Sequence, residues 1–543
     1  MAWNFGDVLD AIIPVLPPQH PALIHGERRV SWEELGRRSN NLARQLRARA
    51  KLRNGAKVAF YMRNRTEYCE ALAACWRGAL THVNVNYRYT PQELAYIFDN
   101  SDSEVVLYGS EFRREVEALR PQLPKVRLWV EIGEGAPLEG ACAYDALAED
   151  GNGGPLDVTR SPQDLLLLYT GGTTGMPKGV MWEHESLSEA QMMSARALGP
   201  VPETPAELAE HIKQNGPGLV MIPACPLMHG TGLFTAMNVL LSGGTIVTLE
   251  GASFQADELW AAVDKHKVQY VSIVGDAFAR PMVEALERAP KKYDLASMVQ
   301  IVSSGVMWSE ATKKRLLDFM PSLVLADAFG SSEAIGFGVS LMTKDSPPVA
   351  TAKFSIGEHC KVFDEQDREV APGSGTPGII AFGGPLPRGY YKDEEKTART
   401  FRTIGGTRYA VPGDWCLVEK DGALTLLGRG SACINSAGEK IFPEEVEEAL
   451  KTHPQIADAL VVGVPDDKWG EAVTGVVALK DGQALNADAL KAHVRTRLAG
   501  YKTPKHIVSS REVLRAPNGK ADYKTARALA MRATHAPTKE TAP

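Results

Sequence analysis

Short, mainly apolar runs alternate with longer amphipathic stretches along most of this chain. Runs of this kind are typical of strands that are buried on both faces of a sheet. They occur at 58–62, 105–108, 165–168, 270–274, 299–302 and 323–325. Because these runs alternate with helical patterns, the sequence predicts an α/β fold with layers of helices on mostly parallel sheets.

Two of the helical patterns begin with recognisable capping residues. Ser31 precedes Glu34 by three positions, and Thr90 precedes Glu93 by the same spacing. In such a capping box the hydroxyl and the carboxylate satisfy backbone N–H groups at the start of a helix. Pro91 adds the proline that the first helical position favours. The sequence therefore predicts helices that begin at residues 32 and 91.

The pattern changes after Phe354. Residues 355–428 are rich in glycine and in strand-forming residues, and Asp421-Gly422 indicates a hairpin, so a small antiparallel β subdomain is expected. A compact unit then follows, with a helix at 443–450, strands at 459–464 and 472–479, a helix at 487–498 and a strand at 506–510. We expect a large N-terminal domain over residues 1–428, a small α/β C-terminal domain over 429–533, and a disordered tail at 534–543.

Composition limits the classes of partner. The chain has 543 residues, too many for one ordinary core, and its net charge of −6 gives no excess of positive charge to hold nucleic acid. Its seven cysteines are scattered without a CxxC pair, so neither a zinc site nor a disulfide framework is expected. The first residues lack the pattern of a signal peptide, and no apolar run reaches membrane-spanning length. We expect a cytoplasmic protein without a membrane span.

A glycine-rich segment follows the apolar run at 165–168. It contains Thr170, Lys178 and, between them, Gly171, Gly172, Thr173, Thr174 and Gly175. Glycines let backbone N–H groups turn toward an anion, threonine hydroxyls add donors, and the lysine adds a positive charge. The spacing differs from Walker A, because Pro177 precedes the lysine and Gly179 follows it. The segment predicts a phosphate-binding loop, with a flexible glycine loop as the alternative.

Further segments combine glycines with residues that can bind or react. They are 226–232 with His229, 303–307 with Ser304 and Gly305, 327–333 with Asp327 and Glu333, 413–415 with Asp414, 428–429 with Arg429, 436–445 with Gly438, and 514–520 with Lys520. Taken alone, each has an ordinary alternative: a structural histidine, a strand-end turn, a surface salt bridge or a solvated lysine. Their order along one chain is the more informative observation.

These segments, in this order, resemble the adenylate-forming superfamily of acyl-CoA synthetases, aryl-CoA ligases, adenylation domains and luciferase. The resemblance covers nearly the whole chain. It implies that MgATP and a carboxylic acid bind the large domain, and that the small domain rotates to let CoA attack the acyl-adenylate. CoA and the acid are then the small-molecule partners. The oligomeric state stays open, with a homodimer among the alternatives.

The resemblance also assigns roles in ATP binding. The loop from Thr170 to Gly175 and Lys178 would bind the phosphates, and Glu333 with Thr170 would hold Mg²⁺ through oxygen ligands. Asp327 would lie near the adenine amino group, and Phe329 would stack on the base. The remaining nucleotide-binding positions implied by the family are Ser304, Gly305, Gly330, Ser331, Ser332, Asp414 and Arg429, the last two at the ribose.

The acid and CoA sites follow from the same resemblance. His229, which is also a candidate catalytic residue, Gly230, Gly275, Val306 and Met307 would line the acid pocket. Lys520 would be the catalytic lysine of the adenylation step, and Gly438 would let pantetheine pass close to backbone. Ser431 stands where relatives usually carry Asp or Lys as the domain pivot, so the hinge residue stays unassigned.

The acid itself is less well defined by the sequence. Residues 274–281 and 179–182 resemble a bacterial branch that includes ligases for fatty acids and steroid side-chain acids. Gly275, Gly230 and Gly232 leave volume for a long or bulky apolar acid. Asp276 is interpreted as the N-cap of the following helix. An adenylase that loads a carrier protein and a catalytically silent nucleotide-binding homologue are the alternatives.

Overall fold

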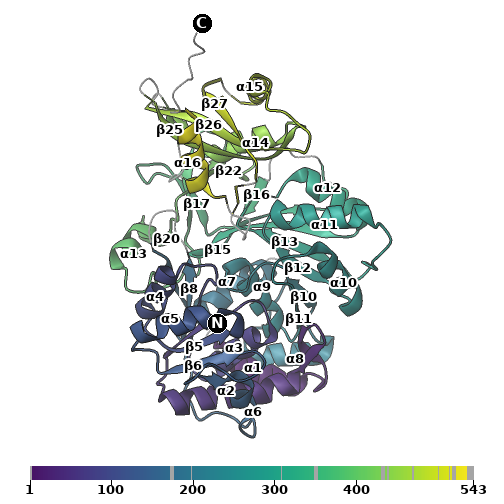
Figure 1. Ribbon diagram of the computed structural model, residues 1–543, viewed down its shortest axis with the longest axis vertical. Helices are drawn as coiled ribbons and strands as arrows, with labels where there is room; N and C mark the ends of the chain where they lie inside the picture. Colours follow the sequence, from purple (N-terminus) through teal and green to yellow (C-terminus); the bar gives the residue numbers. More distant parts are fainter. Residues whose placement is uncertain are drawn as a thin grey trace. The chain divides into compact units, whose positions relative to one another are not determined.

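A computed structural model describes residues 3–170, 176–196, 199–306, 308–347, 353–429, 434–436, 439–466, 470–498, 500–512, 514–515 and 521–534. The chain forms two compact units. The first comprises Met1–Ala350 with Phe382–Ala410, and the second comprises Thr351–Ala381 with Val411–Pro543. Each unit is described by itself below (Figure 1).

The first unit contains a seven-stranded sheet in the order β7-β6-β5-β3-β4-β8-β9. The strands are β3 (Lys57–Tyr61), β4 (Thr81–Asn84), β5 (Ser103–Gly109), β6 (Leu128–Ile132), β7 (Cys142–Ala143), β8 (Leu165–Thr170) and β9 (Lys178–Glu183). Neighbours are parallel except for β8 and β9, which pair antiparallel so that Thr170 lies opposite Lys178. The parallel arrangement confirms the predicted fold class.

Helices cover both faces of this sheet. The helices formed by the first 215 residues are α1 (Phe5–Ile12), α2 (Trp32–Ala50), α3 (Thr66–Arg77), α4 (Pro91–Asn100), α5 (Arg113–Leu119), α6 (Tyr144–Glu149), α7 (His184–Arg196) and α8 (Pro205–Asn215). Of these, α2 and α3 contact the sheet on one face, and α4 and α5 contact it on the other. Ala59 and Tyr61 of β3 pack in one core with Leu94 of α4 and Val116 of α5. The neighbouring side chains Val58 and Phe60 are fully buried as well, which explains why this strand has no polar alternation.

A second sheet in the same unit has the order β15-β14-β13-β12-β10-β11-β1-β2. Its strands are β1 (Pro21–His25), β2 (Arg28–Ser31), β10 (Val220–Pro223), β11 (Thr245–Thr248), β12 (Tyr270–Ile273), β13 (Gln300–Ser304), β14 (Val324–Ser331) and β15 (Ala334–Met342). The strands from β14 to β1 are parallel to one another, whereas β15 pairs antiparallel with β14 and β2 pairs antiparallel with β1. Every apolar run that predicted a strand in the first 330 residues is therefore a strand.

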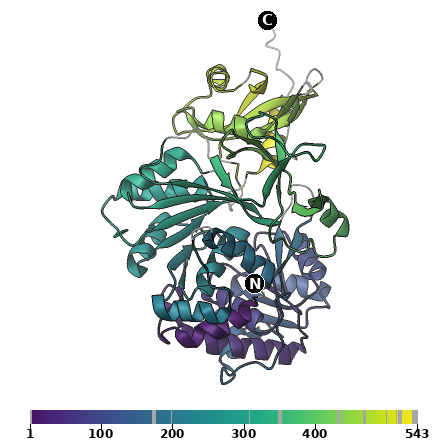
Figure 2. The same ribbon diagram turned by 180° about the vertical axis from the view of Figure 1, so that it is seen from behind.

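Four helices accompany this sheet: α9 (Gly230–Leu241), α10 (Ala256–His266), α11 (Asp276–Arg288) and α12 (Glu310–Phe319). Both ribbon views show α10, α11 and α12 side by side along the sheet (Figures 1 and 2). Trp260 of α10, Met282 of α11 and Leu316 of α12 share one buried core with Ile301 of β13. The helix α13 (Glu394–Thr400) and the hairpin β19 (Phe401–Ile404) and β20 (Thr407–Ala410) complete the unit.

The predicted helix starts are confirmed. Ser31 is the N-cap of α2, and its side chain accepts from the N–H of Glu34. Thr90 and Glu93 form a complete capping box at the start of α4, with proline at the first position. These local bonds satisfy N–H groups that a helix start otherwise leaves unpaired.

The second unit contains β16 (Lys353–Ile356), β17 (Cys360–Phe363), β18 (Gly378–Phe382), β21 (Asp414–Val418) and β22 (Leu424–Arg429). β21 and β22 form the hairpin predicted at Asp421-Gly422, and Gly422 has a φ of 83°. A second sheet follows in the order β24-β23-β26-β25, with β27 beside β26. Its elements are β23 (Ile434–Ser436), β24 (Glu439–Ile441), α14 (Pro443–Lys451), β25 (Ile456–Asp466), β26 (Gly470–Leu479), α15 (Ala487–Arg495), β27 (His506–Ser510) and α16 (Tyr523–Thr534).

The predicted order of helices and strands after residue 443 is confirmed, and α15 is shorter than predicted because it ends at Arg495 rather than at 498. Across the described part of the chain, no helix has both the length and the apolar character that crossing a membrane requires.

Candidate active site

The predicted motifs of the first unit lie at the carboxyl ends of parallel strands. Thr170 is the last residue of β8, Ser304 is the last residue of β13, and β14 ends at Ser331. The register pairs Ile273 with Ser303 and Ser304 with Ala328, so β12, β13 and β14 end at the same edge. Open α/β sheets bind their ligands at this edge.

A hydrogen bond joins the phosphate-loop hairpin to the turn that follows β14. The buried indole of Trp182, on β9, donates to the backbone oxygen of Ser332 at 2.9 Å. Within the turn, the hydroxyl of Ser331 accepts from the N–H groups of Glu333 and Ala334, both at 3.2 Å. Two predicted motifs that are 150 residues apart are thereby held together.

A third segment, which the sequence analysis did not single out, pairs with the free edge of β9. The N–H of Arg388 donates to the oxygen of Met181 and the N–H of Met181 donates to the oxygen of Gly389, both at 2.9 Å. The N–H of Tyr391 donates to the oxygen of Gly179 at 2.8 Å. This pairing brings Tyr390 next to the phosphate-loop hairpin.

Tyr390 contacts two of the predicted site residues. Its hydroxyl donates to Oε1 of Glu333 at 2.6 Å, and the centre of its ring lies 5.5 Å from Nζ of Lys178. The side chain is 6% exposed. A carboxylate and an ammonium group, placed 155 positions apart by the sequence, thus share one aromatic neighbour.

Lys178 lies near a second ammonium group and two carboxylates. Burial is the largest cause that lowers its pKa, to about 8, and the nearby ammonium of Lys396 lowers it further. The carboxylates of Asp393 and Glu333 act in the opposite direction. Two lysines that disfavour each other's charge fit a polyanion, which would relieve their repulsion, and a carboxylate at the same place fits a hard cation. The residues present therefore suit phosphates with Mg²⁺.

Asp327, on β14, has a partner within the protein. Its carboxylate is buried and forms an ion pair with Lys313 of α12, and the Lys313 ammonium lies 5.4 Å from the centre of the Trp308 ring. Burial raises the pKa of Asp327, and the charge of Lys313 partly offsets that shift. Phe329, two residues further, packs against Phe337 with ring centres 5.1 Å apart.

The residues predicted at the acid pocket lie around the start of α9 and the ends of β12 and β13. His229 is the N-cap residue of α9. Gly305 has a φ of 88°, and a Cβ on it would lie 4.0 Å from Oγ1 of Thr231. The N–H of Gly275 donates to Oγ of Ser303 at 2.8 Å. Gly230 is the first residue of α9, and Val306 is half-buried beside the core that contains Trp308.

Two interpretations at this side of the site are corrected. A Cβ at Gly232 would lie 2.5 Å from the backbone oxygen of Pro226, so the packing of α9 requires this glycine. Asp276 is the first residue of α11, whose N-cap is Gly275. Its carboxylate accepts from the N–H of Ser309 at 3.2 Å and pairs with Arg280, so it ties α11 to the start of α12.

In the second unit, Asp414 and Arg429 face each other in the β21–β22 pairing. Gly428 beside them has a φ of 116°, and a Cβ there would overlap the carboxylate of Glu444 at the start of α14. An alanine at this position would displace that carboxylate. Eight predicted site residues lie outside the described part of the chain: Gly171, Gly172, Thr173, Thr174, Gly175, Met307, Gly438 and Lys520. The pivot position, Ser431, lies outside it as well.

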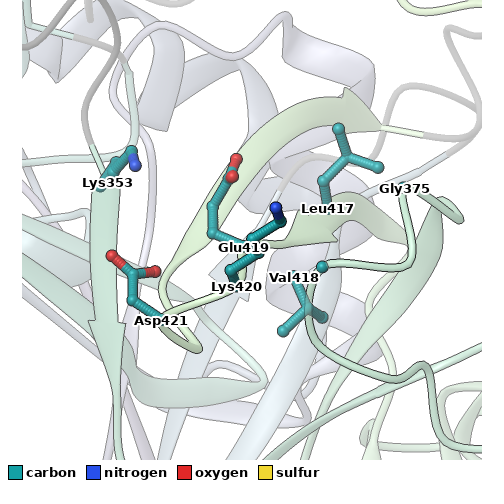
Figure 3. A pocket seen from close by; sticks show the side chains of 8 residues that line it. Lys353, Gly375, Leu417, Val418, Glu419, Lys420 and Asp421 are labelled. Atoms are coloured by element: carbon teal, nitrogen blue, oxygen red, sulfur yellow. The ribbon is translucent and has the colours of Figure 1, made fainter.

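The second unit also carries an open hollow of about 380 Å³ (Figure 3). Lys353, Glu419, Lys420 and Asp421 line it together with Gly373, Gly375, Leu417 and Val418. None of these is a predicted site residue, and the strand ends described above remain the candidate site.

Sequence reasoning missed Lys313, Tyr390 and Lys396. Lys313 lies among the polar residues of an amphipathic helix, and Lys396 lies in a charged stretch, so neither stands out locally. Tyr390 follows Arg388-Gly389 and precedes another tyrosine. A glycine next to two aromatic residues was the available signal, but it does not identify the carboxylate that the hydroxyl binds.

The cluster at the carboxyl ends of the parallel strands suits a phosphate-bearing ligand. The model of the family described as AMP-binding enzyme matches residues 15–391, and that of the AMP-binding enzyme C-terminal domain matches residues 445–520. The chain belongs to the AMP-binding enzyme family.

Similar proteins cover almost the whole chain. A 3-oxocholest-4-en-26-oate–CoA ligase of Rhodococcus rhodochrous is 40% identical over 536 residues, which are 97% of this chain and 96% of that protein. A medium/long-chain-fatty-acid–CoA/3-oxocholest-4-en-26-oate–CoA ligase of Mycolicibacterium smegmatis is 40% identical over 539 residues, with 97% and 96% covered.

Among solved structures, an anthranilate CoA ligase in complex with anthranoyl-AMP has a TM-score of 0.82 at 22% identity, with 98% of both chains covered. A fatty acyl CoA synthetase of Mycobacterium tuberculosis has a TM-score of 0.72 at 22% identity, with 98% of this chain and 99% of that chain covered. At this level of identity the structural likeness bears on the fold.

Proposed function

We propose that this chain is an AMP-forming acyl-CoA ligase. It would join an apolar carboxylic acid to the α-phosphate of ATP, release pyrophosphate, and then transfer the acyl group to CoA with release of AMP. The observation that carries the proposal is the cluster of Lys178, Tyr390 and Glu333 beside the end of β8. Membership of the AMP-binding enzyme family and relatives named as CoA ligases support it.

The charges of the site fit the first step. The acid is already ionised at neutral pH, so its attack needs no general base, but it must approach a polyanion. Lys178 would reduce that repulsion at the phosphates, and Lys520 is proposed to do so at the reacting group. Glu333 and Thr170 would hold Mg²⁺, which supplies positive charge to the phosphate oxygens when bound.

Other residues would position the nucleotide. Asp327 and Phe329 are proposed at the adenine, where a charged acceptor and a ring face suit its amino group and its plane. Asp414 and Arg429 are proposed at the ribose. Ser332, with Ser304, Gly305, Gly330 and Ser331, would line the path between base and phosphates.

The second step is proposed to use the small domain at 429–533. Rotation of that domain would withdraw Lys520 and present Gly438 to the pantetheine of CoA. Lys520→Ala should therefore abolish adenylation but leave thioester formation from supplied acyl-AMP. Equal loss of both half-reactions in a folded variant would contradict this division.

For the acid, we propose a medium or long fatty acid or a steroid side-chain acid. The relatives from Rhodococcus and Mycolicibacterium are named for such acids. His229, Gly230, Gly275, Val306 and Met307 are the proposed lining. The second candidate is transfer of the acyl group to an acyl carrier protein. The relatives are named as CoA ligases, which favours CoA over a carrier protein as the acceptor. We also propose a cytoplasmic location, with a homodimer as one possible assembly.

The test is AMP formation from ATP and Mg²⁺ with and without CoA, across octanoate, palmitate, benzoate and a cholestenoate. The expected result is CoA-dependent turnover with the long or polycyclic acids and little with benzoate. Turnover with a carrier protein but not with CoA would favour the second candidate. Failure of every acid to release pyrophosphate would overturn the proposal.

A further inference from the structure

Tyr390 stands at the meeting point of two opposite charges. Its hydroxyl donates to Oε1 of Glu333 at 2.6 Å, while the face of its ring lies near Nζ of Lys178 at 5.5 Å from the centre. Under the proposed function, Glu333 faces the metal ion and Lys178 faces the phosphates. One side chain therefore contacts both groups that would receive MgATP.

The surroundings of Tyr390 hold it in one place. Its backbone is bridged to Val180 of β9, and its N–H donates to Oγ1 of Thr397 at 2.9 Å. Its ring packs edge-to-face on Phe401 with centres 5.8 Å apart, and its hydroxyl also lies 3.5 Å from Oγ1 of Thr400. Because the side chain is 6% exposed and is contacted on several sides, its hydroxyl is a fixed donor.

A fixed donor has a specific effect on a carboxylate that binds a metal ion. The hydroxyl engages Oε1 of Glu333 and restricts rotation of the carboxylate, so that Oε2 and the remaining lone pairs keep a constant direction. Groups that orient a metal-binding side chain in this way typically change metal affinity about 10–100-fold when they are removed. The cation–π contact with Lys178 restricts the ammonium in the same manner, since a cation is attracted to a ring face.

We infer that Tyr390 is a positioning residue for the MgATP site, orienting the Glu333 carboxylate toward the metal ion and the Lys178 ammonium toward the phosphates. The inference rests on the proposed function, because it assigns Tyr390 a task only if Glu333 faces a metal ion. Tyr390 acts through these two side chains, so it need not touch the nucleotide or the metal ion itself.

The chain offers a matched control at the next position. The hydroxyl of Tyr391 donates to a carboxylate oxygen of Asp102 at 2.8 Å, and Asp102 also pairs with Lys125 and Lys392. Tyr390→Phe and Tyr391→Phe therefore delete the same atom from the same kind of bond. The first lies at the proposed site, and the second lies at a surface network.

The experiment measures Mn²⁺ binding by electron paramagnetic resonance, with a non-hydrolysable ATP analogue and without acid or CoA. For Tyr390→Phe we expect the Mn²⁺ dissociation constant to rise about 10-fold, while Tyr391→Phe leaves it unchanged. In steady-state assays the apparent Mg²⁺ requirement of Tyr390→Phe should rise with little change in the KM for the acid. Thermal unfolding of both variants shows whether each is folded.

Glu333→Gln distinguishes a failure of the proposed role of Glu333 from a failure of the inference about Tyr390. If Glu333→Gln leaves Mn²⁺ binding unchanged, the proposed role of Glu333 fails. If Glu333→Gln weakens binding and Tyr390→Phe does not, the inference about Tyr390 is wrong. If Tyr390→Phe does not fold, Thr397→Val is the substitute, because it removes the acceptor of the Tyr390 N–H. This variant should lose part of the orientation and raise the Mn²⁺ dissociation constant about 2- to 3-fold. An unchanged constant in Thr397→Val would also overturn the inference.

Discussion

Two carboxylates of one motif, Asp327 and Glu333, lie in contrasting environments. Asp327 is buried and carries its own counter-ion, Lys313. Glu333 is half-buried, and its hydrogen-bond donor is the neutral phenol of Tyr390. Folding alone therefore balances the charge of Asp327, whereas the charges of Glu333 and of the nearby Lys178 are arranged for a ligand. A site can combine a part that is complete after folding with a part that is completed by its substrate.

The largest effect should come from breaking the ion pair of Asp327. Lys313→Met leaves a buried carboxylate without its partner, which typically costs about 3–5 kcal/mol in the free energy of unfolding. Urea denaturation at pH 7 measures the loss. Lys396→Met is the control, because it removes an ammonium that disfavours the charge of Lys178, and we expect no loss of stability. Equal loss of unfolding free energy in both variants would contradict the claim that Lys313, and not Lys396, balances a buried charge.

Removing the charge of Glu333 should affect catalysis and not stability. Glu333→Gln keeps the side-chain shape but loses the negative charge proposed to hold Mg²⁺, and we expect adenylation to slow by about 10²–10³-fold, as for loss of one electrostatic contact in a transition state. Single-turnover pyrophosphate release measures the rate. The unfolding free energy should stay within about 0.5 kcal/mol of the parent, as is usual away from buried pairs. A folded variant with full adenylation activity would contradict the assignment.

The pH dependence of nucleotide binding should report on Lys178. Because its pKa is lowered to about 8, its ammonium loses the proton as the pH rises from 7 to 9, and affinity for ATP should fall over that interval. Lys396→Met removes one cause of the lowered pKa, so the fall should move to higher pH. Equilibrium dialysis at a series of pH values, with constant ionic strength, tests both statements. An unshifted midpoint in the variant would contradict the coupling of the two lysines.

The same shift has a defined sign for stability. The folded state gives up the Lys178 proton near pH 8, whereas the unfolded chain keeps it to about pH 10.4. Between these values the unfolded state binds more protons, so the contribution of Lys178 to stability rises with pH. Below pH 8 both states are protonated, and the cost of holding this charge in the fold is present in full.

The smallest effect should come from Asp276. Asp276→Asn weakens one hydrogen bond to the N–H of Ser309 and one partly exposed ion pair with Arg280. We expect a loss of about 0.5–1.5 kcal/mol in unfolding free energy, the usual contribution of one such hydrogen bond. Urea denaturation gives the value. A loss as large as that of Lys313→Met would show that Asp276 belongs with the buried pair near Asp327.

Much of the fold follows from local sequence. The apolar runs at 58–62 and 270–274 become β3 and β12, and Ser31 and Thr90 cap the helices that they were expected to begin. These signals act over a few residues, so a single sequence contains them. The bond between Asp276 and the N–H of Ser309 spans 33 residues, and the local pattern misplaced this aspartate. The local pattern also extended α15 by three residues beyond Arg495.

The candidate site was predicted unevenly for the same reason. Thr170, Lys178 and Glu333 lie in glycine-rich segments with a recognisable spacing, and the structure brings Lys178 and Glu333 to one tyrosine. Tyr390 was missed because its bond to Glu333 spans 57 residues and its bridge to Val180 of β9 spans 210 residues. Tertiary contacts of this range have no local signature.

The pairing of Arg388–Tyr391 with β9 bears on how the protein is made. Arg388 also binds Glu183 across 205 residues, so β9 is synthesised long before the segment that covers its edge. A ribosome at residue 300 has already released the seven strands of the first sheet, and the edge of β9 is then still bare, which makes it a template for association with other chains. Premature termination before residue 391 would therefore leave the edge of β9 uncovered and yield an aggregation-prone fragment.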